Sequence, residues 1–159
     1  MDELARSVGR ELKAANALLV TAESCTGGWA AQVITSVAGS SEWFERGFVA
    51  YSNAAKLELL GVRDETLQRH GAVSEQTAAE MALGALARSK ASVALSITGV
   101  AGPGGGSPDK PVGTVCFAWA RSGGWMRAQT LHLPGDRESV RRQSVVHALQ
   151  GVLKALDGG

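Results

Sequence analysis

The residues best suited to chemistry lie together in residues 21–28, which read Thr-Ala-Glu-Ser-Cys-Thr-Gly-Gly. The segment follows a short apolar run and precedes a helical pattern, so its serine is predicted where a strand ends and a helix begins. That junction exposes side chains, and the free N–H groups of a helix start can hold an anion. Ser24 and Cys25 are both candidate nucleophiles, and Glu23 beside them could bind a polar substrate group or simply face solvent.

A serine nucleophile needs a base, and histidine is the most common one. The three histidines are poorly placed, because His70 precedes a glycine at a predicted helix end, His132 lies in a predicted strand and His147 lies inside the last helix. A lysine can replace histidine when burial lowers its pKa. Lys56 fits because small or apolar residues flank it, and Tyr51 could relay a proton or orient its amine. The alternative is a solvated helix lysine and a tyrosine that only packs in a strand.

Cys25 is the rival nucleophile. A thiolate is more nucleophilic than a hydroxyl, and a helix start lowers the pKa of a thiol. The alternative is a small packing residue in the core. The glycines at 27 and 28 suit either nucleophile, since backbone N–H groups without neighbouring side chains can approach an oxyanion closely.

Two further features could bind an anion. Residues 98–107 contain five glycines, so the backbone could turn its N–H groups inward around a phosphate, although such a loop also serves as a simple connector. Its spacing matches neither a Walker loop nor a dinucleotide fingerprint. Arg137 and Arg141 lie on one face at the start of the last helix, where cations oppose the helix dipole. A bound phosphate would offset that cost; alternatively, Arg141 pairs with Glu138 on a solvated face.

The composition describes an ordinary globular protein. The chain has 159 residues, 45% of them apolar and 19% charged, with a net charge of +1. This predicts one domain over residues 1–159 and argues against a broad nucleic-acid surface. We also expect no membrane span, because no apolar run approaches roughly 20 residues, and no signal peptide. Two cysteines form neither a disulfide framework nor a zinc spacing, so we expect a cytoplasmic protein with reduced thiols.

Hydrophobic periodicity predicts an α/β fold. Leu4, Val8 and Leu12 recur every four residues and predict a first helix. Further helices are predicted over 29–39, 54–60 and 64–70, with a single turn at 41–44. Two more begin after the N-caps Ser74 and Asp136. The predicted strands are 17–22, 47–51, 92–97, 113–120 and 125–133. This order predicts a mostly parallel sheet with one antiparallel member and helices on both faces. Because ligands bind beyond the carboxyl ends of parallel strands, residues 23–24, 51–56 and 98–106 should converge there.

Six motifs, in this order along nearly the whole chain, resemble the CinA C-terminal domain family, whose stand-alone members are bacterial nicotinamide-nucleotide amidases. They occupy residues 21–28, 51–56 (Tyr-Ser-Asn-Ala-Ala-Lys), 71–75 (Gly-Ala-Val-Ser-Glu), 97–105 (Ile-Thr-Gly-Val-Ala-Gly-Pro-Gly-Gly), 110–115 (Lys-Pro-Val-Gly-Thr-Val) and 135–137 (Gly-Asp-Arg). The resemblance implies a three-layer α/β/α sandwich with a mixed five-stranded sheet. It also implies hydrolysis of nicotinamide mononucleotide (NMN) to nicotinate mononucleotide and ammonia in pyridine nucleotide salvage, without a metal or other cofactor.

The family's catalytic serine, lysine and tyrosine correspond to Ser24, Lys56 and Tyr51. With the resemblance included, N–H groups near residues 26–28 would stabilise the oxyanion, and the glycine loop with Arg137 or Arg141 would hold the ribose phosphate. The full set of predicted substrate-binding residues is Glu23, Thr26, Gly27, Gly28, Asn53, Thr98, Gly99, Gly102, Arg137 and Arg141.

Two other functions stay open on the sequence. The same clefts could sense a pyridine nucleotide without hydrolysing it, or the chain could hydrolyse another small amide. Trp43, Phe44 and the apolar helix faces could supply a self-complementary patch, which makes a homodimer a further expectation.

Overall fold

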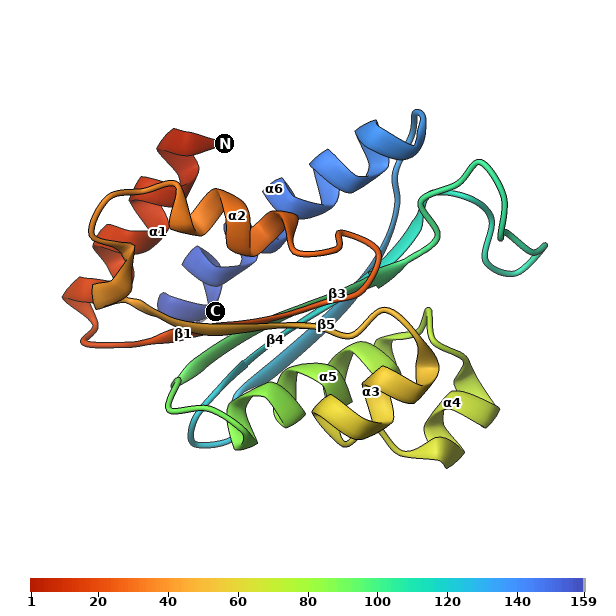
Figure 1. The fold of residues 1–159 in the computed structure, drawn as a ribbon, viewed down its shortest axis with the longest axis horizontal. Helices are drawn as coiled ribbons and strands as arrows, with labels where there is room; N and C mark the ends of the chain where they lie inside the picture. Colours follow the sequence, from red (N-terminus) through yellow and green to blue (C-terminus); the bar gives the residue numbers. More distant parts are fainter. Residues whose placement is uncertain (159) are drawn as a thin grey trace.

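The computed structural model describes residues 1–158, which form a five-stranded sheet between two layers of helices (Figure 1). The strands are β1 (Leu19–Glu23), β2 (Phe44–Val49), β3 (Val93–Gly99), β4 (Thr114–Arg121) and β5 (Met126–His132). Their spatial order is β2-β1-β3-β4-β5. β1 pairs in parallel with β2 and β3, whereas β4 is antiparallel to both β3 and β5. Only β4 therefore runs against the others, which confirms the predicted α/β fold with one antiparallel strand.

Helices cover both faces of the sheet (Figure 1). One layer contains α1 (Asp2–Ala14), α2 (Trp29–Thr35) and α6 (Arg137–Leu156), and the other contains α3 (Asn53–Leu60), α4 (Asp64–His70) and α5 (Glu75–Ala87). Alternation along β1 divides its side chains between two cores, because successive residues of a strand point to opposite faces. Leu19 packs in the core under α1 and α6, whereas Val20 and Ala22 pack in the core over α5.

Local sequence signals account for most helix boundaries. The hydroxyl of Ser74 accepts the N–H of Thr77 at the start of α5, and the carboxylate of Asp136 accepts the N–H of Ser139 at the start of α6. Both are the N-caps that the sequence predicts. None of the helices within residues 1–158 is long and apolar enough to cross a membrane.

The prediction was wrong around the edge strand β2. This strand begins at Phe44, three residues before the predicted start, and the predicted turn at 41–44 is a short 3-10 helix, η1 (Ser40–Glu42). The carbonyl of Trp43 already accepts the N–H of Leu19, so sheet pairing begins there. α2 also ends at Thr35, before the predicted end at Gly39, whose φ of 83° instead places it at the start of η1. An edge strand has one unpaired side and alternates weakly, which hides its start in the sequence.

The topology gathers the predicted functional segments. β1 and β3 end at the same edge of the sheet, and β4 begins there because it runs the opposite way. The turn after β1, the segment between β2 and α3 and the start of α6 all lie at this edge (Figure 1).

Candidate active site

The hydroxyl of Ser24 and the amine of Lys56 are in direct contact. Ser24 follows β1, and its N–H donates to the carbonyl of Ile97 at 2.9 Å, which fixes the serine backbone against β3. Lys56 lies in α3, whose first turn is capped by the hydroxyl of Ser52. The Nζ of Lys56 lies 3.0 Å from the Oγ of Ser24, across 32 residues of sequence. Two separate elements thus bring a serine hydroxyl and an amine within hydrogen-bond distance.

Burial changes the chemistry of this pair. The Lys56 side chain is 1% exposed and Ser24 is 7% exposed. Removal from water disfavours the charged ammonium and therefore lowers the pKa of Lys56. A neutral amine has a lone pair that can accept the proton of Ser24. In that state, the Nζ–H can still donate to the carbonyl of Tyr51, 3.2 Å away.

Cys25 is a poor nucleophile in this setting. Its side chain is 6% exposed and belongs to the core under α1 and α6. Desolvation raises the pKa of its thiol to about 11, although its own backbone N–H and the positive charge of Arg141 act in the opposite direction. The thiol is therefore protonated at neutral pH, contrary to the lowered pKa expected at a helix start.

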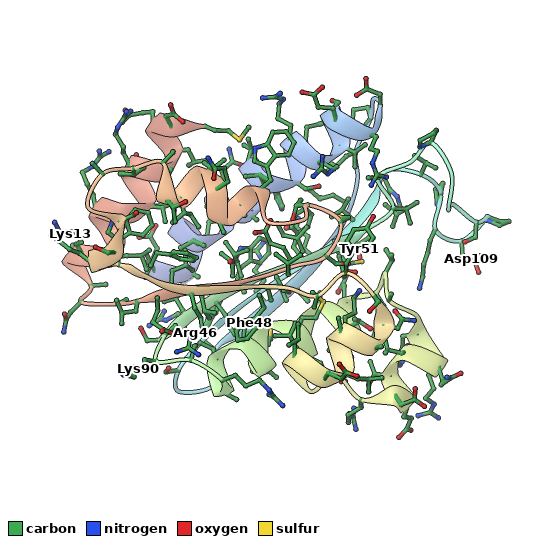
Figure 2. All side chains as sticks on the ribbon, viewed as in Figure 1. Lys13, Arg46, Phe48, Tyr51, Lys90 and Asp109 are labelled. Carbon is green, nitrogen blue, oxygen red and sulfur yellow. The ribbon has the colours of Figure 1, made fainter. Side chains whose placement is uncertain are left out.

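Tyr51 contacts the pair through its backbone instead of its phenol. Its carbonyl accepts from Lys56 and lies 3.4 Å from the Oγ of Ser24. Its side chain is 61% exposed at the sheet edge (Figure 2), and its hydroxyl accepts from the guanidinium of Arg137 at 3.3 Å. A main-chain carbonyl therefore orients the amine. Every residue type has such a carbonyl, so the tyrosine in the sequence does not reveal this contact.

The carboxylate of Glu23 is occupied inside the protein. It is 1% exposed and accepts the hydroxyl of Thr26 at 2.6 Å and the N–H groups of Ala30 and Ala31 at 2.9 and 3.1 Å. α2 has a glycine, Gly28, at its N-cap and no side-chain cap there, so Glu23 takes over the N–H groups of the second and third helical residues. The side chains of Glu23 and Thr26 thus bond within the turn and to α2. Contact of either residue with a substrate stays a prediction, and for Thr26 the group still available is its backbone N–H.

The two predicted arginines lie in α6 and donate to backbone carbonyls of other segments. Arg137 donates to the carbonyl of Gly102 at 2.8 Å and to the phenol of Tyr51. Arg141 donates through Nε to the carbonyl of Cys25 at 3.0 Å and through Nη2 to that of Thr26 at 3.1 Å. The alternative prediction, an ion pair between Arg141 and Glu138, is wrong because Glu138 pairs with Arg142 at 2.8 Å.

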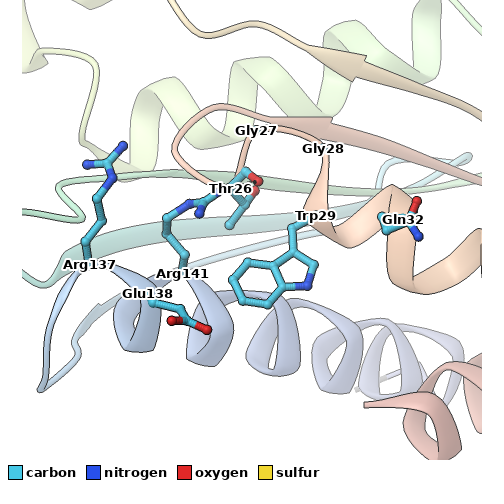
Figure 3. Close-up of a pocket in the computed structure, with 8 residues that line it drawn as sticks. All are labelled: Thr26, Gly27, Gly28, Trp29, Gln32, Arg137, Glu138 and Arg141. Atoms are coloured by element: carbon cyan, nitrogen blue, oxygen red, sulfur yellow. Dashed lines mark hydrogen bonds between the residues drawn. The ribbon is translucent and has the colours of Figure 1, made fainter.

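A cleft of about 720 Å³ lies between the turn that follows Ser24 and the start of α6 (Figure 3). It is lined by Thr26, Gly27, Gly28, Trp29, Gln32, Arg137, Glu138 and Arg141. Ser24 and Lys56 do not line it; its nearest residue in the sequence, Thr26, follows Ser24 by two positions. Positive φ angles of 60° and 103° explain the glycines at 27 and 28, since other residues rarely adopt them. The cleft is therefore a candidate for the bulk of a substrate whose reacting group reaches Ser24.

Residues 1–156 match the CinA C-terminal domain family. The chain belongs to this family. It is 57% identical over 148 residues to the nicotinamide-nucleotide amidohydrolase PncC of Escherichia coli K12, which covers 93% of this chain and 90% of that relative. A PncC of Pseudomonas putida is 50% identical, with 95% and 94% covered. The crystal structure of the competence/damage inducible protein CihA from Agrobacterium tumefaciens matches with a TM-score of 0.94, at 46% identity over 98% of this chain and 94% of that one.

The glycine loop of this CinA-family chain stays a prediction as a backbone phosphate site, and the contacts of three of its predicted residues are internal to the protein. Thr98 is 1% exposed, and its hydroxyl donates to the carbonyl of Ala72. Gly99 ends β3, where an added Cβ would lie 2.9 Å from the carbonyl oxygen of Thr114. Gly102 offers its carbonyl to Arg137. Asn53 is exposed at the first residue of α3, and it stays a prediction as a substrate contact.

Three residues that line the cleft of this CinA-family chain are absent from the predicted substrate-binding set. They are Trp29 and Gln32 of α2 and Glu138 of α6. The position of Trp29 directly after two glycines was the available signal. The histidines lie elsewhere, as expected. His147 packs against Phe117 and Trp119 and contacts Gln129 at 2.9 Å, and burial lowers its pKa.

Proposed function

We propose that this chain hydrolyses the carboxamide of NMN to nicotinate mononucleotide and ammonia, with Ser24 as nucleophile and Lys56 as base. The class of reaction follows from the family, because relatives that are 50% identical or more over most of the chain are amidohydrolases. The observation that carries the mechanism is the buried 3.0 Å contact between the Nζ of Lys56 and the Oγ of Ser24. The product would return to NAD through pyridine nucleotide salvage.

The proposed reaction uses one proton carrier in both directions. Neutral Lys56 takes the proton of Ser24 as Oγ attacks the carboxamide carbon, and the carbonyl electrons move onto oxygen. When the tetrahedral intermediate collapses, the C–N bond breaks and the Lys56 ammonium protonates the departing nitrogen, which leaves as ammonia. Water then attacks the ester on Ser24 while Lys56 accepts its proton, and that proton returns to Ser24 as nicotinate mononucleotide leaves.

Tyr51 supports both protonation states of the amine. Its carbonyl is an acceptor 3.2 Å from Nζ, so it can accept an N–H from the amine and from the ammonium alike. This contact keeps the Lys56 nitrogen directed at Ser24 after the proton has moved, which avoids reorganisation during the reaction.

Arg137 is the proposed phosphate ligand. It lines the cleft, and its guanidinium forms its bonds with a carbonyl and a phenol, both neutral, so its charge is available to a phosphate. Turnover of nicotinamide riboside, which lacks the phosphate, tests this assignment. A riboside turned over as efficiently as NMN would remove the proposed role of Arg137.

Ammonia release from NMN tests the nucleophile. We expect Ser24→Ala and Lys56→Met to reduce turnover by at least 10²-fold, and Cys25→Ala, which removes the neighbouring thiol, to retain most of it. Mass spectrometry after incubation with NMN should place an acyl adduct on the peptide containing residues 21–28. A Ser24→Ala protein of near-normal turnover, with an inactive Cys25→Ala protein, would assign the reaction to the thiol. NMN binding without ammonia at any pH would instead fit a nucleotide sensor.

A further inference from the structure

Several backbone N–H groups of the turn after Ser24 have hydrogen-bond partners within the protein. The N–H of Ser24 donates to Ile97, that of Gly27 donates to the carbonyl of Ser24 at 3.0 Å, and that of Trp29 donates to the carbonyl of Thr26 at 3.0 Å. Within residues 1–158, the N–H of Thr26 forms none of the backbone or side-chain hydrogen bonds of this turn. This donor, two residues after the nucleophile, is therefore free to bind a substrate oxygen.

Arg141 sets the direction of that donor. In a planar trans peptide, the C=O and the N–H point to opposite sides. Arg141 holds the carbonyl of Cys25 at 3.0 Å, so the N–H of the same peptide, which belongs to Thr26, points away from α6. The guanidinium rises from α6 to this turn, beside the ring of Trp29 (Figure 3).

The peptide between Thr26 and Gly27 is held in the same way, and its N–H has a recorded partner. Arg141 also holds the carbonyl of Thr26, at 3.1 Å, and the N–H of that peptide, which belongs to Gly27, donates to the backbone carbonyl of Ser24. The same guanidinium holds both peptides by their carbonyls, and the N–H of Gly27 on the far side of one of them is directed at the backbone of Ser24. We propose that Arg141 is a positioning residue for the proposed amide hydrolysis, holding the N–H of Thr26 as an oxyanion donor beside Ser24. This inference rests on the proposed function for its reaction.

The positive charge of Arg141 also favours an oxyanion beside Ser24. The guanidinium lowers the pKa of the Cys25 thiol, so its field favours negative charge at the residue next to the nucleophile. Hydrogen bonds to two carbonyls also polarise the peptides and strengthen their N–H groups as donors. This role differs from the phosphate contact expected for Arg141, because two of its donor groups already serve the turn.

The neighbouring arginine provides a matched control. Arg142 lies one residue further along α6 and stacks on the same indole, with its guanidinium carbon 5.2 Å from the Trp29 ring centre against 5.4 Å for Arg141. Its partner is the exposed carboxylate of Glu138, and it bonds to neither carbonyl of the turn. Arg141→Lys and Arg142→Lys are the same chemical change in the same helix, and only the first removes the paired contacts.

Steady-state ammonia release from NMN gives the first readout. We expect Arg141→Lys to lower kcat by about 10²–10³-fold, the usual effect of losing one oxyanion donor, with KM changed by less than about threefold. Arg142→Lys should leave both constants unchanged, and thermal unfolding of both variants should be similar. A raised KM with unchanged kcat in Arg141→Lys would mean that Arg141 binds substrate and would overturn the inference, as would equal losses of kcat in the two variants.

Labelling by an alkyl fluorophosphonate gives a readout that does not need NMN. The Oγ of Ser24 forms a bond to phosphorus, fluoride leaves, the proton passes to Lys56, and the phosphoryl oxygen occupies the oxyanion position. Intact mass measures the rate, which we expect to fall at least tenfold in Arg141→Lys alone. Arg141-dependent labelling in a protein that releases no ammonia from NMN would support the inference and refute only the proposed substrate. Equal labelling of all three proteins, or none in the wild type, would overturn the inference.

Discussion

Replacing Lys56 with methionine should change how the stability of the protein depends on pH. The amine is 1% exposed, and burial lowers its pKa from the value of 10.5 that applies in the unfolded chain. Between the lowered pKa and 10.5, the unfolded chain therefore binds one proton more than the native protein. Stability rises with pH wherever the unfolded state binds more protons, so the wild type should gain stability as pH increases through this window.

The size of the effect follows from one proton. A difference of one bound proton changes the free energy of unfolding by at most about 1.4 kcal/mol per pH unit. Methionine keeps a similar unbranched chain in the buried site and cannot ionise, so Lys56→Met should lack this slope. Below the native pKa both states of the wild type are protonated and the difference between the two proteins becomes constant. The variant should therefore gain stability relative to the wild type as the pH falls.

Urea unfolding between pH 6 and 10.5 measures this difference directly. Other groups, such as His147, titrate in both proteins and cancel in the comparison. Lys90→Met removes an exposed lysine and should give a curve parallel to the wild type. Parallel curves for the wild type and Lys56→Met would refute the reasoning, because they would mean that the amine keeps its ordinary pKa after folding. In that case Lys56 could not serve as a neutral base near pH 7.

Three further substitutions test the packing around the site. The hydroxyl of Thr21 is buried and has no hydrogen-bond partner within residues 1–158, so Thr21→Val should raise the free energy of unfolding by about 1–3 kcal/mol in urea. Glu23→Gln weakens three bonds to the turn and α2 and should cost about 1–3 kcal/mol, seen as a lower Tm. A Cβ on Gly84 would collide with the carbonyl oxygen of Leu60, so Gly84→Ala should destabilise by about 1–3 kcal/mol in urea despite its better helix propensity. A neutral or stabilising Gly84→Ala would show that α3 and α5 separate easily.

Local patterns were sufficient for the framework of this protein. α4 begins and ends where the sequence predicts, and the caps of α5 and α6 are correct, because the relevant interactions span only three or four residues. The meeting of Ser24 with Lys56 also follows from topology, since parallel strands β1 and β2 end at one edge of the sheet.

The partners of individual side chains could not be predicted in the same way. The phenol of Tyr51 meets Arg137 across 86 residues, and Arg141 meets the carbonyl of Cys25 across 116. No periodicity records contacts at such separations, because they depend on how α6 crosses the sheet. Glu23 is a similar case. A carboxylate next to a serine suggests a substrate ligand, because the sequence does not show that this side chain points back into its own turn.

The charges around Ser24 have a common consequence. Glu23 accepts N–H groups at the start of α2, while Arg141 donates to the carbonyls of residues 25 and 26, so one charged side chain holds the donors and the other holds the acceptors. A short turn held in both ways keeps its geometry before a substrate arrives, and such preorganisation avoids a reorganisation cost in the transition state. Loss of either side chain should therefore reduce kcat more than substrate affinity, although neither needs to touch the substrate.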